Sequence, residues 1–525
     1  MEPKTQVEIQ LGHMCNNRCV FCVSGQQTAF GRARPLPFEP LLTSVRDAYA
    51  KGHRKLTLLG GEPTLQPAFK DVVAEAVQLG FEEVVIFTNG VKTAREGFLE
   101  EILALAPRRG FFTWRISIQG ANQDSHERTT RKPGSFARIL RTMDSLKARN
   151  ERITVNMCVV GSNFASVDEF PALVSRYDVK QLHLDMVRPM DAGERTDEEF
   201  AEMMPTYTEM VGPLSRLCRG VPDDFDLNIG NLPFCFAPDL ARWIHHDGEA
   251  TETIAVDGER DLSRPWDKYF VKRRDKFKPP QCERCAFEPR CSGIFQKYAE
   301  LHGTDEVVPV LPERLPSLDP GRRVFWAHLT EVARRLSALG EADARPSVWL
   351  FGDNELRVRW ALPRGNDALL LALRPPGPGI GSTDVFSLHV LEVPADRETA
   401  RRFLSQVWHS ASAGQRLLHP CGDDALTPIS RLLAARLARL RAAAPFSGVV
   451  WVSTRIVGTR RAEVLFRADD GGEAQLWLDE AQGRATGGYR LLGEPTPDLR
   501  SGLREVLGSL SARQPREPAV LKVAP

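Results

Sequence analysis

Three cysteines near the amino terminus have the spacing of metal ligands. They lie in the run Cys15-Asn-Asn-Arg-Cys19-Val-Phe-Cys22, directly after a short apolar segment. Three thiolates on one short loop can hold three corners of a 4Fe–4S cube, which leaves the fourth iron open to a small chelating ligand. A tetrahedral zinc ion is the alternative; it would need a fourth ligand, for which His13 is the nearest candidate.

A second polar segment follows the apolar run at 55–59, and it reads Gly60-Gly61-Glu62-Pro63. Two glycines at the end of a strand let the backbone approach a ligand closely, and Glu62 can accept hydrogen bonds from an ammonium group. An ordinary turn between a strand and a helix is the alternative interpretation. The next apolar run ends in a further polar turn at Asn89, which we expect at the same edge of a sheet.

The cysteine loop and the Gly-Gly-Glu-Pro segment together resemble the radical S-adenosylmethionine (SAM) superfamily, over roughly residues 5–190. The resemblance implies an iron–sulfur enzyme whose catalytic cluster is bound by Cys15, Cys19 and Cys22. The open iron would chelate the methionine moiety of SAM, and the cofactor would be held by Gly60, Gly61, Glu62, Pro63 and Asn89. Reduction of the cluster would cleave SAM to methionine and a 5′-deoxyadenosyl radical that abstracts hydrogen from a substrate. A reductase, ferredoxin or flavodoxin would be the electron donor.

Further cofactor contacts are implied by the same resemblance. Ser117 and Gln119 fall on one side of a predicted strand and are similar to positions that contact ribose in this superfamily. Members often carry an arginine for the cofactor carboxylate at the position that is Thr130 here, so Arg128 or Arg131 is expected to replace it. An ordinary solvated loop residue is the alternative for each of these polar side chains.

A second group of cysteines lies near the middle of the chain, at Cys282, Cys285 and Cys291, with Cys235 as the natural fourth ligand. Four thiolates suit zinc and iron equally well when taken alone. The Cys-x2-Cys-x5-Cys spacing resembles the auxiliary-cluster extensions called SPASM and Twitch domains, although Phe295 replaces a further SPASM cysteine. We therefore expect two 4Fe–4S clusters, one that binds SAM and one auxiliary cluster that conducts electrons or stabilises the fold.

The three remaining cysteines are interpreted as thiols outside the clusters. Cys158 lies in an apolar run and is expected to be a small buried hydrophobic residue. Cys218 matches the start of the full SPASM pattern, but other ligands of that pattern are missing. Cys421 lies in a polar loop and is expected to be a bystander.

These residues must be positioned by an alternation of strands and helices. Strands are predicted at Val7–Leu11, Lys55–Leu59, Glu83–Thr88, Thr113–Gln119, Ile153–Val160 and Gln181–Val187. Helices are predicted between them, near Pro40–Lys51, Ala68–Leu79, Glu96–Leu105, Phe136–Ala148 and Val167–Arg176. This pattern predicts an α/β fold with a parallel sheet, and the resemblance makes it a partial (β/α)6 TIM-like barrel. The chemistry is expected at the carboxyl ends of the strands.

The 525 residues are too many for one core, so several domains are expected. We predict a radical SAM core at 1–195, an irregular auxiliary-cluster domain at 196–306, a proline-rich linker at 307–322 and an α+β domain at 323–525. Similar patterns about 100 residues apart suggest two repeats in the last domain, at 323–425 and 426–512, including a helix at Ile429–Ala442; coincidence is the alternative.

Composition limits the classes of function. The 69 basic and 68 acidic residues nearly cancel, so no nucleic-acid or membrane partner is expected. No apolar run approaches the length of a membrane span, and a cytoplasmic protein is predicted. The favoured function is hydrogen abstraction from a peptide, as in the maturation of ribosomally made peptides (RiPPs). The alternatives are cofactor or natural-product biosynthesis by the same radical chemistry, and a non-catalytic zinc- or cluster-binding scaffold.

Overall fold

The computed structural model forms two compact units, Met1–Val310 and Leu311–Pro525. It describes residues 6–319, apart from 96, 223, 224, 247, 249 and 259. It also describes residues 324–523 except 340–345, 352–354, 362–367, 375–384, 413–415, most of 419–445, 458–459, 482–483 and 512–520. None of the helices in this described part has both the length and the apolar character needed to cross a membrane.

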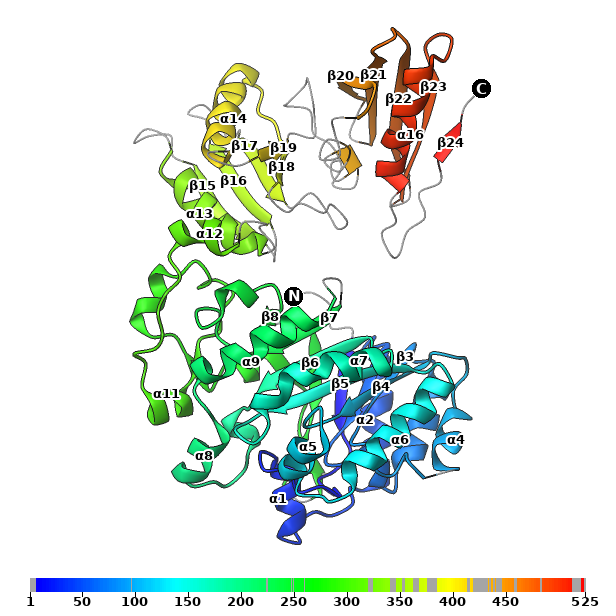
Figure 1. The fold of residues 1–525 in the computed structure, drawn as a ribbon, viewed down its shortest axis with the longest axis vertical. Helices are drawn as coiled ribbons and strands as arrows, with labels where there is room; N and C mark the ends of the chain where they lie inside the picture. The colour runs from blue at the N-terminus through cyan, green and yellow to red at the C-terminus, as the bar shows by residue number, and fades with distance from the viewer. Residues whose placement is uncertain are drawn as a thin grey trace. The chain divides into compact units, whose positions relative to one another are not determined.

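A ten-stranded sheet forms the centre of the amino-terminal unit (Figure 1). In spatial order its strands are β12 (Trp266–Asp267), β9 (Thr251–Ile254), β1 (Gln6–Gln10), β2 (Lys55–Leu59), β3 (Glu83–Thr88), β4 (Phe112–Ser117), β5 (Arg152–Val159), β6 (Gln181–Met186), β7 (Asp226–Gly230) and β8 (Ile244–His245). Every described pairing in the sheet is parallel except that of β12 with β9. The predicted α/β class and the order of the first six strands are confirmed.

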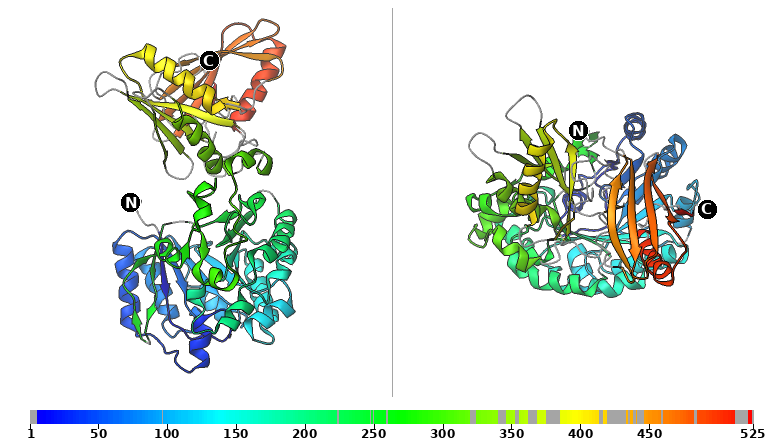
Figure 2. Two further views of the ribbon diagram at one scale, coloured as in Figure 1. Left: turned by 90° about the vertical axis from the view of Figure 1, so that its left-hand side faces the viewer. Right: turned by 90° about the horizontal axis from the view of Figure 1, so that it is seen from above.

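Helices connect consecutive strands and lie along the outer side of the sheet (Figures 1 and 2). They are α1 (Val23–Ala29), α2 (Phe38–Ala50), α3 (Phe69–Leu79), α4 (Phe98–Leu103), α5 (Gln123–Thr130), α6 (Ser135–Ala148) and α7 (Phe170–Arg176). The five predicted helices match α2, α3, α4, α6 and α7. The short helices α1 and α5 were not predicted. In the case of α5 the reason is that the helix is polar throughout and has no apolar stripe that a sequence pattern could show.

The two faces of the sheet differ in polarity. On β1 the outward residues Val7 and Ile9 are fully buried, whereas Gln6 and Glu8 point to the inner side. On β4 Trp114 and Ile116 face outward, and Arg115 between them faces inward. Strands buried on both faces in a parallel sheet are usually apolar throughout. The period-two alternation therefore gives this partial barrel an apolar jacket and a polar interior.

The sheet continues beyond residue 195, where the core domain was predicted to end. Strand β7 pairs with β6, and β9 pairs with β1 at the opposite edge. The segment after 196 also contains α8 (Asp197–Met203) and α9 (Tyr207–Gly220) instead of an irregular chain. Each of these helices begins with a threonine and glutamate capping box, a local signal that the sequence carries but hydrophobic periodicity does not show.

The rest of this unit consists of short elements around the second cysteine group. They are β10 (Val256–Asp257), β11 (Asp261–Leu262), α10 (Lys268–Lys272), β13 (Lys276–Phe277), β14 (Ile294–Phe295) and α11 (Gln296–His302). The first residues of the predicted linker pack against this region, because Val307 and Val310 are buried and the Ala286 amide donates to the Val310 carbonyl over 2.8 Å.

The carboxyl-terminal unit contains two five-stranded sheets with the same order of elements. The first has β15 (Ser347–Phe351), β16 (Glu355–Ala361), β17 (Ala368–Arg374), β18 (Val385–Glu392) and β19 (Arg416–Leu418). The second has β20 (Val449–Ile456), β21 (Arg461–Ala468), β22 (Glu473–Ala481), β23 (Arg484–Leu491) and β24 (Leu521–Val523). The helices are α12 (Leu315–Leu318), α13 (Phe325–Ser337), α14 (Arg397–Ser412) and α16 (Pro497–Ser511).

In both sheets four antiparallel strands are followed by a helix and then by a fifth strand parallel to the fourth. Each sheet has its own hydrophobic core. The repeats suggested at 323–425 and 426–512 stay a prediction, and β24 lies beyond the second range. The helix expected at Ile429–Ala442 lies mostly outside the described residues.

Replacement of Phe112 by alanine is expected to destabilise the amino-terminal unit. Phe112 is buried on the outer face of β4 beside Trp114, and loss of a buried phenylalanine side chain costs about 3–5 kcal/mol. Phe270 is 67% exposed, and its change to alanine should cost no more than about 0.5 kcal/mol. Urea denaturation followed by circular dichroism measures both. Equal losses in the two variants would contradict the assignment of Phe112 to the core.

Candidate active site

The amino-terminal cysteine loop is fixed to helix α5 by backbone hydrogen bonds. The Arg18 amide donates to the Thr130 carbonyl over 2.9 Å, and the Val20 amide donates to the Thr129 carbonyl over 3.0 Å. Cys22 precedes the first residue of α1. The loop is therefore held at both its middle and its end, which sets the directions of its thiols.

The three thiols of this loop are largely withdrawn from solvent. Burial raises the pKa of Cys15 to about 12 and also raises the pKa values of Cys19 and Cys22. Thiolates in such a place need positive charge next to them, and the irons of a cluster supply it. Where the structure describes the chain, no three His, Cys, Asp or Glu side chains converge closely enough for one metal ion. Zinc needs all its sulfurs at about 2.3 Å from one point, so the three thiols fit the separate irons of a cube better.

The glycine pair places the turn after β2 directly against the cysteine loop. The Gly61 amide donates to the Gly12 carbonyl over 2.7 Å, and the Glu62 amide donates to the Met14 carbonyl over 2.8 Å. A Cβ atom on Gly61 would lie 2.5 Å from the Met14 carbonyl oxygen and would also overlap the carbonyl of His13. Gly61 is thus required by a backbone-to-backbone contact, which the sequence interpretation attributed to a ligand.

Glu62 is fully buried and ties the ends of two strands together. Its Oε1 accepts hydrogen bonds from the Thr64 hydroxyl at 2.6 Å and the Thr88 hydroxyl at 2.7 Å, and its Oε2 accepts one from the Asn89 amide at 2.7 Å. Burial raises the pKa of this carboxyl, while the same hydrogen bonds oppose the rise. Pro63 follows as the first residue of a single 3₁₀ turn. Oε2 keeps room for a further donor, such as a ligand ammonium group.

Asn89 connects the end of β3 to the cysteine loop. Its Nδ2 donates to the Asn16 side-chain oxygen at 2.7 Å and lies 3.7 Å from the Cys15 sulfur. Its amide binds Glu62, so one residue joins the first three strand ends. Asn89 thereby has a positioning role for Cys15.

The two predicted ribose contacts lie at the end of β4 and just beyond it. The Ser117 hydroxyl donates to the Asn156 side-chain oxygen at 3.1 Å. Gln119 is buried, and its Oε1 accepts from the Cys158 amide at 3.0 Å, so this side chain holds β5 in place. Ribose binding by Ser117 and Gln119 stays a prediction.

The two predicted arginines are placed differently. Arg128 pairs with Asp124 at 2.7 Å and donates to the Ser162 carbonyl at 3.0 Å. Arg131 is exposed and ends α5 with a left-handed backbone at φ 50°. In the described part of the chain no hydrogen bond or ion pair links either side chain to the cysteine loop.

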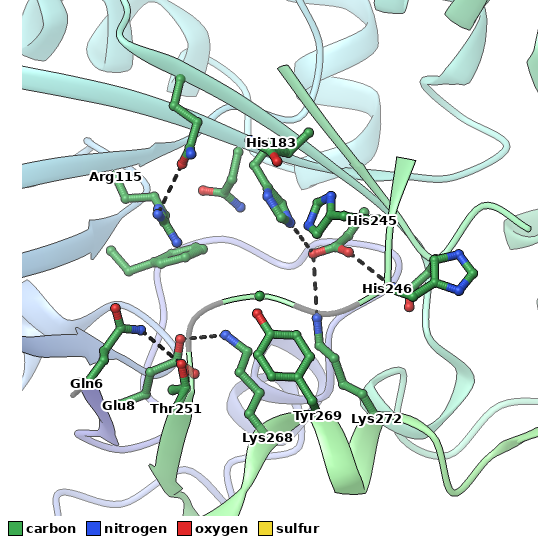
Figure 3. Close-up of a pocket in the computed structure, with 18 of the residues that line it drawn as sticks. Gln6, Glu8, Arg115, His183, His245, His246, Thr251, Lys268, Tyr269 and Lys272 are labelled. Carbon is green, nitrogen blue, oxygen red and sulfur yellow. Dashed lines mark hydrogen bonds and ion pairs between the residues drawn. The ribbon is translucent and has the colours of Figure 1, made fainter. Parts of the chain in front are cut away.

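A cavity of about 380 Å³ lies inside the partial barrel (Figure 3). Asn156, the partner of Ser117, also lines the cavity and so connects it to the predicted cofactor contacts. The sequence interpretation missed this cavity. The signal was the alternation of polar residues along otherwise apolar strands, as in Gln181, His183 and Asp185 of β6, all three of which line it.

One wall of the cavity carries an acid–base cluster (Figure 3). His183 Nε2 lies 2.8 Å from the Asp185 carboxylate, and the Lys272 ammonium lies 3.9 Å from it. Burial alone would raise the pKa of Asp185, but Lys272 and His183 hold it well below its usual value. Burial lowers the pKa of His245 to about 4, so this ring is neutral at pH 7, and its buried Nδ1 has no hydrogen-bond partner. His245 can therefore accept or donate a proton toward a bound molecule.

The structure brings the second cysteine group together. Four thiols line a small cavity of about 20 Å³, those of Cys235, Cys282, Cys285 and Cys291. Burial raises the pKa values of Cys235 and Cys291, and raises that of Cys282 to about 11. The buried Tyr207 hydroxyl has no hydrogen-bond partner in the described part of the chain, and Cys291 and Cys235 are among its electrostatic neighbours. This orphaned donor and the four thiols fit a sulfur-rich cluster.

The other cysteines and His13 have separate surroundings. Cys158 was expected to lie outside the clusters, but it is close enough to the first site that its thiolate form would interact electrostatically with Cys19 and Cys22. Cys218 is buried within α9. Cys421 lies outside the described residues. His13 was the candidate fourth ligand of a zinc ion. Its Nδ1 lies 2.8 Å from the Ser24 hydroxyl, so one of its two ring nitrogens is already hydrogen-bonded.

A family model matches the part of the chain that contains the first site. Residues 9–170 match the model of the radical SAM superfamily. The chain carries a radical SAM domain. The resemblance inferred from the cysteine loop and the Gly-Gly-Glu-Pro segment is confirmed, and these two features lie within the matched range.

The radical SAM domain also has relatives of known name. The chain is 28% identical to a GTP 3′,8-cyclase of Rhodopseudomonas palustris over 204 residues, which are 38% of this chain and 56% of that protein. It is 26% identical to an S-adenosylmethionine-dependent nucleotide dehydratase of Lacinutrix mariniflava over 221 residues, 39% of this chain and 44% of that protein. The chain thus spans about half the length of these two curated relatives.

Solved structures with a radical SAM domain are similar at a lower level. Streptococcus suis SuiB bound to S-adenosylmethionine matches with 13% identity and a TM-score of 0.40, over 58% of this chain and 75% of SuiB. Native anSMEcpe with bound AdoMet matches with 13% identity and a TM-score of 0.42, over 62% of this chain and 99% of anSMEcpe.

Replacement of Gly61 by alanine is expected to weaken SAM binding and to lower 5′-deoxyadenosine release about a hundredfold. The added Cβ pushes the turn after β2 away from the cysteine loop, and a displacement of about 1 Å is enough for such a loss. Equilibrium dialysis with labelled SAM measures binding, and circular dichroism checks the fold. Gly508→Ala is the matched control, because no atom lies within 4 Å of the added methyl group. A folded Gly61→Ala protein with unchanged SAM affinity would disprove the contact.

Proposed function

We propose that this protein is a radical SAM enzyme that abstracts hydrogen from a substrate held inside the partial barrel. The observation that carries the proposal is the joint placement of three thiols withdrawn from solvent and the Glu62–Asn89 network at the strand ends, with a polar cavity lined by other residues of the same sheet. A scaffold without catalysis would have no need for a polar interior with a neutral histidine at 245 whose Nδ1 lacks a hydrogen-bond partner among the described residues.

Each part of the site has a proposed task. Cys15, Cys19 and Cys22 hold a 4Fe–4S cluster, and Gly60, Gly61, Glu62, Pro63, Asn89, Ser117 and Gln119 shape the SAM pocket, with Arg128 or Arg131 as the candidate for its carboxylate. When bound and reduced, the cluster supplies the electron that cleaves SAM and yields the 5′-deoxyadenosyl radical. The interior of the partial barrel shields the substrate from water, and His183, His245 and Asp185 line the cavity and could move a proton.

Cys235, Cys282, Cys285 and Cys291 are proposed to hold an auxiliary 4Fe–4S cluster. Four cysteines leave no open iron, so this cluster would conduct electrons or stabilise the fold. An electron donor of the reductase, ferredoxin or flavodoxin class is proposed for the first cluster.

The substrate class is argued from the cavity and the relatives. A volume of about 380 Å³ suits a small molecule, and the polar lining suits one rich in hydrogen-bonding groups. The sequence relatives bear the names of GTP 3′,8-cyclase and a nucleotide dehydratase. We therefore favour a small polar substrate, as in cofactor biosynthesis, over the peptide expected from sequence. A peptide could reach the cavity only by inserting one of its own side chains.

Two triple variants test the roles of the two cysteine groups. Changing Cys15, Cys19 and Cys22 to alanine should abolish 5′-deoxyadenosine release and leave about four of the seven to eight irons of the reconstituted chain. Changing Cys282, Cys285 and Cys291 to alanine should also remove about four irons. Anaerobic reconstitution, iron analysis and dithionite-driven turnover measure both properties.

The buried Cys218 provides the control for this experiment. Cys218→Ala should retain all the iron and the full rate of SAM cleavage, because this thiol lies in α9 apart from both groups. If the Cys15, Cys19 and Cys22 variant releases 5′-deoxyadenosine as fast as the unchanged protein, the proposed function is wrong.

A simple fractionation tests the substrate class. A low-molecular-weight filtrate of cell extract should raise 5′-deoxyadenosine release above its rate with SAM alone, and prior protease treatment of the filtrate should not remove the effect. Stimulation confined to a protease-sensitive fraction would instead support a peptide substrate.

A further inference from the structure

Arg115 occupies an unusual place among the cations of the barrel interior. It points inward from β4 into the cavity, beside the acid–base cluster (Figure 3). Its Nη2 donates to the Gln181 side-chain oxygen over 3.3 Å, a long bond to a neutral acceptor. Its Nε is buried and has no hydrogen-bond partner among the residues that the structure describes. A guanidinium held in this way keeps a strong donor unsatisfied, at a cost that a native fold rarely accepts without a functional reason.

The other cations that line the cavity have carboxylate partners. Lys268 pairs with Glu8, and Lys272 pairs with Asp185. Lys55 lies 3.9 Å from Glu83, a carboxylate that is not part of the cavity lining. In the described part of the chain, Arg115 is the cationic lining residue for which no ion pair is found. The lining contains four Lys and Arg side chains and two carboxylates, so the cavity keeps an excess of positive charge.

The surroundings of Arg115 make this excess effective. Its guanidinium lies 5.6 Å from the centre of the Phe87 ring, which keeps water from one side. Burial lowers the pKa of Arg115, and the carboxylates of Glu8, Asp185 and Glu83 oppose this change without forming an ion pair with it among the described residues. An arginine remains charged even so, and attraction to an anion is stronger in such a water-poor site than at the surface.

We propose that Arg115 binds an oxyanion of the substrate, either a carboxylate or a phosphate, through the donors that the fold leaves unsatisfied. The inference rests on the proposed function, since it places the substrate of that function in the cavity. The planar guanidinium offers parallel N–H groups that match two oxygens of one anion, which lysine cannot do. Ser117 lies two residues beyond Arg115 on β4, and its partner Asn156 lines the cavity, so a molecule anchored at Arg115 would extend toward the predicted SAM pocket.

Binding of two simple anions to the full, anaerobically reconstituted chain tests the proposal. Inorganic pyrophosphate stands for a phosphate substrate and glutarate for a carboxylate, and calorimetry at low and high salt measures each affinity. At least one anion should bind, and Arg115→Gln should weaken it about tenfold to a hundredfold. The anion that binds more tightly assigns the substrate as phosphate or carboxylate. Binding of neither anion, or equal binding by Arg115→Gln, overturns the proposal.

The controls separate charge, folding and the underlying function. Arg141→Gln removes an exposed arginine of α6 and should leave anion binding unchanged. Arg115→Lys keeps the charge but loses the paired donors, so it should bind more weakly than the unchanged protein even if Arg115→Gln fails to fold. Release of 5′-deoxyadenosine from SAM alone is measured in parallel. If the unchanged protein releases no 5′-deoxyadenosine, the proposed function is wrong. If release is normal but Arg115→Gln binds the anions as tightly as the unchanged protein, only the role of Arg115 is wrong.

Discussion

The candidate active site depends on one buried carboxylate. Glu62 receives hydrogen bonds from its own turn and from the end of β3, and its amide is bonded to the cysteine loop. A carboxylate removed from water is costly unless its oxygens are satisfied, so the donors must stay where they are. This requirement fixes the ends of β1, β2 and β3 relative to one another. The thiols can then be held in a set geometry before any cluster is assembled.

The two faces of the sheet in the partial barrel have to meet different requirements. A parallel sheet covered by helices needs apolar residues on its outer face, and a bound polar molecule needs hydrogen-bonding groups on its inner face. Period-two alternation satisfies both, as Trp114 and Ile116 face outward while Arg115 faces inward. The cost is that inward charges must pair with one another, which Lys268 and Glu8 do.

Much of this could be predicted from the sequence, because the relevant signals are local. The runs at 55–59 and 83–88 form strands with the predicted bounds, and the Cys15 loop follows β1 directly. The reason for Gly61 could not be predicted, since it depends on the carbonyls of a loop that is distant in sequence.

Long-range pairing explains the remaining differences. Strand β9 is four residues long and pairs with β1, from which it is separated by more than 240 residues, and no local pattern reports that contact. The domain boundary predicted at residue 195 therefore falls inside one sheet. The polar cavity was missed for the same reason, because alternation on one strand acquires meaning only when neighbouring strands place their polar residues on the same side.

The cavity and the second cysteine group are joined by polar contacts. Asn231 donates to Asp185 at 3.1 Å and accepts from Lys276, whose ammonium also donates to Ser292 at 3.1 Å. Ser292 follows Cys291 directly, and its amide donates to the cavity residue His246 at 2.7 Å.

Such a continuous set of part-buried hydrogen bonds couples the positions of its members, because a member that moves leaves a partner unsatisfied. His246 is suited to this position, since burial lowers its pKa to about 3 and keeps the ring neutral, with one nitrogen accepting from Ser292 and the other donating to the Leu232 carbonyl. The loop of the second cysteine group thus forms part of the wall that shapes the cavity. A cluster bound there would influence the substrate position through this wall, whether or not it also carries electrons.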